Sequence, residues 1–450
     1  MIIKGSFNDS ELEFLTYNFE VKNTKSICFK LINFPFEHIS VIVRDPLSKI
    51  RGLFTFKTRQ EKFVITNSSS SNLFNTDVIN DGIWTIEVAR TYKVNEGFEL
   101  CVEFNTNDVT NEYYDIDFDK SKIYNADKGW YSGDLHMHSN YSDGRVGLDE
   151  VCRSSERMNL DFISITEHNV FTTKYVKKDY PIIPATEVTW DNDGHYNAYN
   201  LKGFIDYGKY VKNNSNKNIA LDEMFSDLKK DDVYLSLNHP FSKGKSLGHD
   251  IDVGNFKFIE VINAPHLAVK EIDNDKAIKL FDYLWLNGIY LYGIGGSDSH
   301  KCNYKEEYYP IGLPTNRIHL EWLSIENILN SMLKGNLYVQ LYNKFELDIE
   351  SECKSLLPGD RVDGNVTYKV SCDEVVEFIL YKNGKNINTI NGKNCVFNFV
   401  VNENDFYRVE AIKNNEVILF TNPVHNMTKE KTKSRTLEII EDFNKSYGGM

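Results

Sequence analysis

The chain has 450 residues and a formal net charge of −14. A chain of this length exceeds one ordinary hydrophobic core, so we expect two to three domains. The acidic balance argues against extended nucleic-acid binding, which needs a basic surface. No run approaches the ~20 apolar residues of a membrane helix, no apolar leader opens the chain, and the seven scattered cysteines indicate reduced thiols, so we expect a cytoplasmic protein with no membrane partner.

Residues 1–123 alternate short apolar runs with polar and glycine-bearing turns. Several short strands at such spacing predict an antiparallel β-sandwich. The expected strands are SICFKLINF, ISVIVRD, KFVITN, IWTIEVAR and FELCVEF. Residues 117–129 are expected to form a linker, and His38, the lone histidine before it, is expected to be structural.

The middle region, residues 128–340, alternates strand-like runs with helical stretches, which is typical of βα units. The expected helices are residues 148–158, 221–230, 274–288 and 324–336. Apolar residues from Ala277 to Leu284 recur at helical spacing and predict one buried face. Ser324 suits the N-cap of the last helix, and Gly335 suits its C-terminal end.

Strand-like patterns return over residues 342–425 and predict a smaller, immunoglobulin-like β-sandwich. Within them Asn383 and Gly384 form a strong hairpin signal. This region could bind a sugar or a substrate, but packing against the middle region is the favoured interpretation. Residues 426–450 form a charged tail, which we expect to be a short helix with a frayed end.

Six of the eleven histidines follow apolar, strand-like runs in the middle region, each with carboxylates close by. In the first motif, GDLHMHSNYSDG, a strand from Trp130 to Leu135 leads into His136 and His138, and Asp143 follows. Residues two apart in an extended segment face the same side, so both imidazoles can reach one ion.

Further motifs of the same kind recur along the middle region. They contribute His168 after residues 162–165, Glu187 after 182–183, His195 opening an aromatic run, His239 after 234–237, and Asp298 and His300 after 289–294. Any one of these could be a hydrogen-bonded structural residue, but nine at successive strand ends predict a multinuclear metal site. Imidazole and carboxylate together suit Zn, Mn or Fe better than Ca or Mg alone.

The series HMH with SDG, then TEHN, NHP and GSDSH resembles the motifs of the polymerase and histidinol phosphatase (PHP) metallohydrolases. The resemblance covers residues 128–340, about half of the chain, and is closest to the carbaryl-hydrolase-like branch, whose members often carry β-sandwich domains. It implies an α/β fold: a distorted (β/α)7 barrel, flanked here by N-terminal and C-terminal β-sandwiches, with up to three metals at the carboxyl ends of its strands.

Carried over residue by residue, the resemblance implies three divalent transition metals. The first would be held by His136, His138, Glu187 and Asp298, and Glu187 would bridge to a second completed by His195 and His239. The third would be held by Asp143, His168 and His300. The chain has TEHN where many relatives have TDHN, so Glu167 is expected to orient a ligand and not to bind a metal itself.

The resemblance implies a metal-dependent hydrolase, most readily a phosphoesterase acting on a small phosphate ester or nucleotide. A water shared between two metals would have its pKa lowered toward ~7 and supply a hydroxide nucleophile. Glu187 and Asp298 are therefore catalytic candidates. Because metal-binding motifs do not distinguish a phosphoryl from an acyl group, a carboxyl-ester or carbamate hydrolase stays open. A non-catalytic PHP scaffold is less favoured, since every ligand position is filled.

The expected partner is a small, phosphorylated substrate, and the sequence leaves the oligomeric state open. Arg317, in PTNRIHL, is the best candidate to contact the substrate anion, because relatives carry a similar element near the site. The weaker candidates, each of which could equally be a surface or loop residue, are Arg145, Lys243, Lys245, His249 and His266. Cys302 could be a soft ligand, although a structural thiol is the favoured interpretation.

Overall fold

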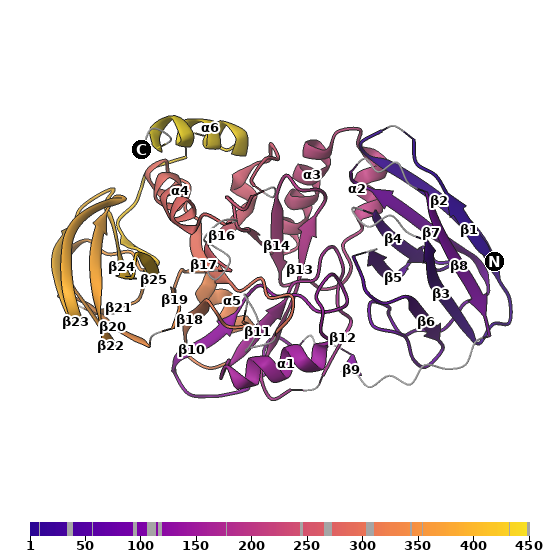
Figure 1. Cartoon of the computed structure of the whole chain (residues 1–450), viewed down its shortest axis with the longest axis horizontal. Helices are drawn as coiled ribbons and strands as arrows, with labels where there is room; N and C mark the ends of the chain where they lie inside the picture. The colour runs from indigo at the N-terminus through magenta and orange to yellow at the C-terminus, as the bar shows by residue number, and fades with distance from the viewer. Residues whose placement is uncertain are drawn as a thin grey trace.

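The computed structural model describes residues 1–8, 10–33, 39–55, 57–92, 97–105, 114–115, 119–176, 178–243, 246–264, 272–302, 310–342, 344–352, 354–431 and 433–447. His38, Lys245 and His266 lie outside these described residues, so the predictions made for them stay predictions. The chain has a mixed α/β fold with large sheets and few helices (Figure 1).

Two four-stranded antiparallel sheets form the N-terminal region, drawn in indigo in Figure 1. Their strands are β1 (Ile2–Gly5), β2 (Glu13–Val21), β3 (Ser26–Asn33), β4 (Ile39–Arg44), β5 (Ile50–Thr55), β6 (Lys62–Thr66), β7 (Gly82–Arg90) and β8 (Phe98–Phe104). One sheet has the order β1-β8-β3-β6 and the other β2-β7-β4-β5. Stacked rings such as Phe54 and Phe63, with centroids 4.9 Å apart, fill the core between them.

The middle region carries most of the helices. Its elements are β9 (Tyr114–Asp115), β10 (Gly129–Asp134), α1 (Leu148–Arg157), β11 (Phe162–Ile165), β12 (Lys174–Tyr175), β13 (Ile182–Thr189), β14 (His195–Tyr199), α2 (Tyr207–Asn213), α3 (Lys217–Lys230), β15 (Tyr234–Leu237), a 3-10 turn (Val253–Asn255), β16 (Phe256–Asn263), α4 (Asn274–Leu286), β17 (Tyr292–Gly296), β18 (Thr315–Leu320), α5 (Ile325–Leu333) and β19 (Leu337–Gln340).

The long middle sheet runs β17-β16-β15-β14-β13-β11-β10-β18-β19. β10, β11 and β13 pair in parallel, as do β15, β16 and β17. β14 is antiparallel to both neighbours. Only residues 190–194 join it to β13, and so short a connection cannot return the chain for a parallel pairing of these two strands. The outermost strands of the part that runs from β10 to β17 also meet each other, since Met137 after β10 forms a parallel bridge with Ser299 after β17.

The four predicted helices are present as α1, α3, α4 and α5. The Ser324 side chain caps α5 by accepting from the Asn327 N–H at 3.2 Å, and Gly335 follows the helix with a φ of +72°. The sequence patterns did not indicate α2, β16, β18 or β19. α2 has only seven residues, too few to show a helical period, and its N-cap Asp206 accepts from the Lys209 N–H.

The C-terminal strands continue the middle sheet, because β19 pairs with β25. The elements are β20 (Phe345–Ser351), β21 (Ser355–Leu356), β22 (Gly364–Lys382), β23 (Lys385–Val401), β24 (Phe406–Lys413), β25 (Glu416–Thr421), β26 (Val424–His425) and α6 (Thr436–Tyr447). The predicted hairpin joins β22 to β23, with positive φ at both Asn383 and Gly384. Strands on both sides of residue 341 belong to the same sheet. The boundary between the middle and C-terminal domains therefore stays a prediction.

The C-terminal region is tied to the middle region by buried contacts. The Arg408 guanidinium on β24 donates to both Asp282 oxygens on α4, at 2.8 and 2.6 Å. α6 lies over α4 (Figure 1), where Phe443 and Tyr283 meet with ring centroids 5.7 Å apart. None of the helices in the described ranges combines the length and apolar character that crossing a bilayer requires.

Candidate metal centre

All nine predicted ligand residues lie together at one end of the middle sheet. They form overlapping groups whose potential ligand atoms lie within 4.8 Å of one another. The groups are His138, Asp143, His168 and His300; His136, His138 and Asp298; His136, Glu187 and His239; and His168, Glu187 and His195. The structure therefore brings together residues from six separate motifs of the sequence.

Backbone pairing explains how the first and last motifs meet. The His138 N–H donates to the Ser299 carbonyl at 2.9 Å, and the Asp298 N–H donates to the His136 carbonyl at 2.9 Å. Asp298 has a φ of +51°, which side-chain-bearing residues rarely adopt. Strain of this kind concentrates at functional sites, where the surrounding structure holds it in place.

Glu187 lies at the centre of the buried end of the cluster. One of its carboxylate oxygens lies 3.2 Å from His195 Nδ1 and 3.4 Å from both His136 Nε2 and His239 Nε2. The other lies 2.9 Å from His168 Nδ1. Burial alone would raise the pKa of Glu187, but the surrounding histidines hold it well below its usual value. A carboxylate placed in this way can bridge two cations.

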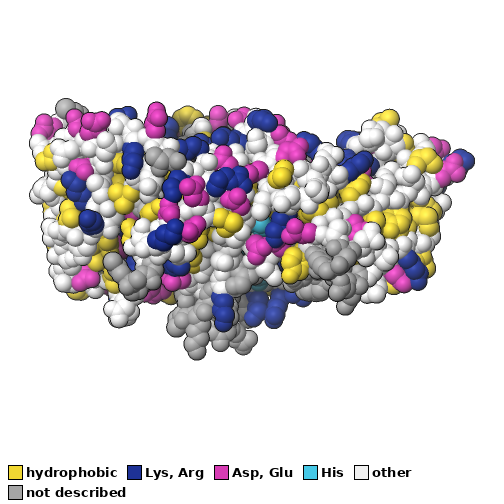
Figure 2. Space-filling model, turned by 90° about the horizontal axis from the view of Figure 1, so that it is seen from above, with side chains coloured by type: hydrophobic (Ala, Val, Ile, Leu, Met, Phe, Trp, Pro, Cys, Tyr) yellow, Lys and Arg dark blue, Asp and Glu magenta, His cyan; other side chains and the backbone are white. Residues whose placement is uncertain are grey.

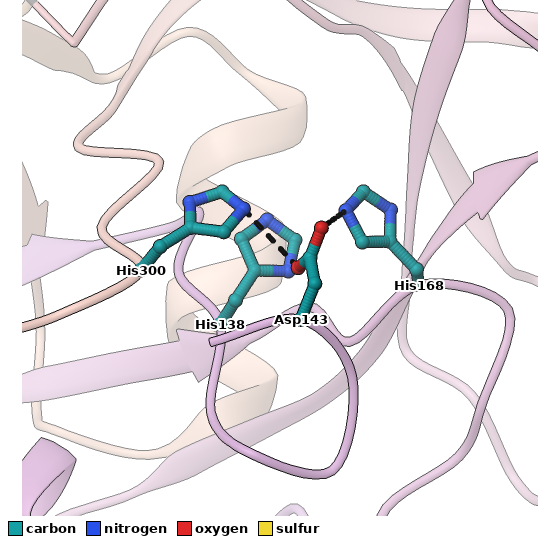
Figure 3. A group of neighbouring side chains, drawn as sticks. All are labelled: His138, Asp143, His168 and His300. Atoms are coloured by element: carbon teal, nitrogen blue, oxygen red, sulfur yellow. Dashed lines mark ion pairs between the residues drawn. The ribbon is translucent and has the colours of Figure 1, made fainter. Parts of the chain in front are cut away.

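Asp143 lies at the more exposed end of the cluster, between two histidine rings (Figure 3). Its carboxylate oxygens are 3.4 Å from His168 Nε2 and 3.2 Å from His300 Nε2. The side chains of Asp143 and His300 are 22% and 28% exposed, whereas those of His136 and His138 are fully buried. On the face shown in Figure 2, histidine appears only in small areas between other side chains.

Glu260 supports two ligands and was missed by the sequence analysis. One oxygen lies 2.7 Å from His136 Nδ1, and the other accepts from the His239 N–H at 2.9 Å. A carboxylate on Nδ1 fixes the ring so that Nε2 faces the cluster. The only signal for Glu260 is an acidic residue inside the apolar run of β16, where all but one residue is buried.

Glu167 lies in none of the ligand groups. It accepts hydrogen bonds from the Ser139 N–H at 2.9 Å and from the Ser139 and Ser142 hydroxyls. Burial raises its pKa to about 7. These contacts hold the loop that carries His138 and Asp143, which is consistent with the orienting role expected for Glu167.

The structure does not bring Arg317 to the cluster. On β18 it pairs with Ser132 and donates to the Ser132 hydroxyl. Ser132 precedes His136 by four residues, a distance of about 13 Å along an extended strand. The neighbouring Asn316 faces the opposite side and bonds Gly295. Arg317 is therefore placed toward the other end of β10.

The remaining candidates are spread around the cluster. Arg145 is exposed beside it, and its N–H donates to the His300 carbonyl at 2.6 Å. Lys243 is exposed. His249 lies in a separate group with Asp191 and Asp193, where the Lys217 ammonium contacts both carboxylates. Cys302 is buried and belongs to none of the groups found among the described residues.

The donor set fits a divalent transition ion. His168 Nε2 and Glu187 Oε2 are buried and lie within ion-pair distance of Asp143 and His168, but among the described residues neither atom makes a hydrogen bond of suitable geometry. The Nε2 atoms of His136 and His138 face each other at 3.2 Å. Buried polar atoms are ordinarily satisfied, so these are places where a cation would complete the site. Imidazole nitrogens with carboxylate oxygens are the ligands that Zn, Mn and Fe accept.

A scan against models of known protein families finds no match, and no curated protein matches the chain. Among solved structures, a Bacteroides vulgatus protein described as a two-domain protein containing a predicted PHP-like metal-dependent phosphoesterase is 17% identical, with a TM-score of 0.36. The match covers 71% of this chain and 100% of that one.

An FMN-binding β-glucuronidase from Faecalibacterium prausnitzii is 9% identical, with a TM-score of 0.18. That match covers 93% of this chain and 91% of the other. At these TM-scores neither likeness establishes a shared fold.

Proposed function

We propose that this chain is a metal-dependent hydrolase of the PHP type that acts as a phosphoesterase on a small phosphate ester or nucleotide. The observation that carries the proposal is the convergence of six histidines and three carboxylates from six sequence motifs in one cluster. The motif resemblance supports the same class, and within it the carbaryl-hydrolase-like branch.

A distorted (β/α)7 barrel is part of the proposal. Its support is the parallel pairing among β10, β11 and β13 and among β15, β16 and β17, together with the bridge that joins the two ends of the series. His136, His168, His239 and Asp298 follow the carboxyl ends of four of these strands. Enzymes built on such barrels place their active sites at that face.

Two to three divalent ions, Zn, Mn or Fe, would be held by His136, His138, Asp143, His168, Glu187, His195, His239, Asp298 and His300. Bound there, such ions activate water and offset charge that develops on a phosphoryl group. The Glu187 carboxylate lies within 3.5 Å of five histidines, which supports a bridging role. His138 belongs both to the group with Asp143 and to the group with His136, so the geometry alone does not assign it to one ion. The division of the ligands among three ions is therefore part of the proposal.

The chain's own residues prepare this site. Glu260 holds a proton on His136 Nδ1 and leaves the Nε2 lone pair for a cation. The Thr189 hydroxyl lies 2.8 Å from His168 Nδ1 and helps to fix the orientation of the His168 ring. His136, His138 and Glu187 are fully buried, so bulk water is excluded from this end of the cluster. The substrate would approach from the exposed end, at Asp143 and His300.

The test is a substrate panel assayed with metal-stripped protein reconstituted separately with Mn, Zn and Fe. We expect phosphomonoester or phosphodiester turnover that depends on added metal, and none from Glu187→Gln protein. Turnover of neutral aryl esters or carbamates without phosphoester turnover would overturn the proposal in favour of an acyl hydrolase. No turnover of any substrate by metal-replete protein would favour a scaffold.

A further inference from the structure

A turn of the N-terminal sheets reaches the exposed end of the ligand cluster. The turn follows β5 and contains Lys57 and Arg59. The Lys57 ammonium lies 3.6 Å from Asp143 Oδ2. The Arg59 N–H donates to the Asn140 carbonyl at 3.2 Å, and Arg59 Nε donates to the Asp143 carbonyl at 3.1 Å. Three contacts therefore join this turn to the loop between His138 and Arg145.

The turn is held in place by its own hydrogen bonds. The Thr58 N–H donates to the Thr55 carbonyl at 3.1 Å, and the Thr58 hydroxyl accepts from the Thr55 N–H at 3.3 Å. Nearby, Asn72 accepts from the Thr173 and Lys174 N–H groups at 2.9 and 3.0 Å. These bonds fix the N-terminal sheets against the segment that follows His168, so the position of Lys57 is set by the fold.

Lys57 is nearly buried, with 12% of its side chain exposed. Among the described residues, Asp143 is the only carboxylate that pairs with it. An ammonium group has no lone pair and cannot bind a metal. Once Asp143, His168 and His300 hold a divalent cation, the single negative charge of Asp143 does not offset both that cation and Lys57, so a further anion is favoured beside them.

The surroundings favour an anion at this position. The chain carries 65 acidic and 51 basic residues, yet the exposed Arg145 lies on the same loop as Asp143, and its N–H bonds the His300 carbonyl. The carboxylates at this end, Asp143 and Asp298, belong to the ligand groups. When their charge is offset by metal, the cations that remain at the exposed end present a positive wall to an entering substrate.

We propose that Lys57 binds the anionic phosphoryl group of the substrate, so that the N-terminal sheets form one wall of the active site and select phosphomonoesters over neutral esters. This inference rests on the proposed function and names its substrate class. Lys57 binds through charge-assisted hydrogen bonds to the phosphoryl oxygens that point away from the metals.

The test measures inorganic phosphate binding to the metal-loaded full-length protein by titration calorimetry, beside metal content and steady-state kinetics. Lys57→Met keeps the length of the side chain and removes the charge, and Lys57→Arg keeps the charge. Lys49→Met is the matched control, because Lys49 lies in the loop between β4 and β5 of the same N-terminal region and pairs with the exposed Asp77. A lost charge-assisted bond predicts about tenfold weaker phosphate binding for Lys57→Met.

We expect Lys57→Met to keep its metal, to raise KM for a phosphomonoester and to leave neutral-ester turnover unchanged. Lys57→Arg should restore most of the affinity, and Lys49→Met should behave as wild type. Phosphate binding unchanged in Lys57→Met, lost together with metal, or absent from the wild type would overturn the inference. Wild-type turnover of neutral esters alone would defeat the proposed function, while the binding comparison would still report on Lys57.

Discussion

The buried end and the exposed end of the ligand cluster are held in different ways. His136 and Glu187 are supported by Glu260 and Asn238, and all four lie in the middle region. Asp143, at the exposed end, also contacts Lys57 and the rest of its turn in the N-terminal sheets. We call the buried end, with His136 and Glu187, the floor and the exposed end, with Asp143, the rim. Under the proposed function the floor would retain metal through neighbours in the middle region. The rim would combine the N-terminal and middle regions to select a substrate.

The largest effect should come from the floor. Glu187→Gln replaces a carboxylate that lies within 3.5 Å of five histidines by a neutral amide, which cannot bridge two cations. Turnover should fall by more than the ~10–100-fold typical of changes to outer contacts, and elemental analysis should show the loss of both metal equivalents that Glu187 is proposed to bridge. Glu156→Gln, at an exposed ion pair with Lys178, is the control. Normal metal content and turnover in Glu187→Gln protein would refute the bridging role.

Glu260→Gln should have the next largest effect. Its amide can accept from His136, but the amide NH₂ would then face the His239 N–H, which now donates to a carboxylate oxygen. We expect metal affinity to fall by about 10–100-fold, measured by competition with a chelator of known affinity. Glu326→Gln on α5 should leave the affinity unchanged. Equal affinities for the wild type and Glu260→Gln would show that the floor does not depend on this carboxylate.

Asp143→Asn should have a smaller effect confined to the rim. The amide oxygen can still reach a cation but carries no charge, so one equivalent of metal should be lost while the floor keeps its own. Elemental analysis at matched protein concentration distinguishes this result from that of Glu187→Gln. If Asp143→Asn emptied the whole cluster, the separation between floor and rim would be wrong.

Arg317→Ala should have the smallest effect. The guanidinium bonds Ser132, about 13 Å along β10 from His136. The inhibition constant for phosphate should therefore stay within about twofold of the wild-type value. That change is well below the tenfold that corresponds to 1.4 kcal/mol. A loss of phosphate inhibition equal to that of Lys57→Met would place Arg317 at the substrate after all.

The convergence of the proposed ligands could be predicted because eight of the nine follow, open or lie within an apolar strand-like run, and a strand fixes where its end lies. Asp143, in the SDG turn, was expected only from the motif resemblance. Parallel pairing then gathers the ends of several strands at one edge, as it does for His136 and His168. The hairpin at Asn383 and the helix cap at Ser324 could also be predicted, because each depends only on residues that are neighbours in the sequence.

The residues that escaped prediction depend on register and on contacts distant in sequence. Arg317 was expected near the substrate from its motif, but a strand alternates its faces, and here Asn316 takes the inner one. Glu260 lies inside an apolar run with no turn to mark it. Lys57 precedes Asp143 by 86 positions, and only the packing of the N-terminal sheets against the middle region brings the two together.

The pairing of β19 with β25 has a consequence for the edges of the middle sheet. A strand at the edge of a sheet presents unpaired N–H and C=O groups that can recruit another chain. β19 is fully buried and pairs on both sides, with β18 and with β25. Removing everything after residue 341 would leave β19 as a bare, apolar edge beside β18. The C-terminal strands therefore act as a guard against edge-to-edge aggregation.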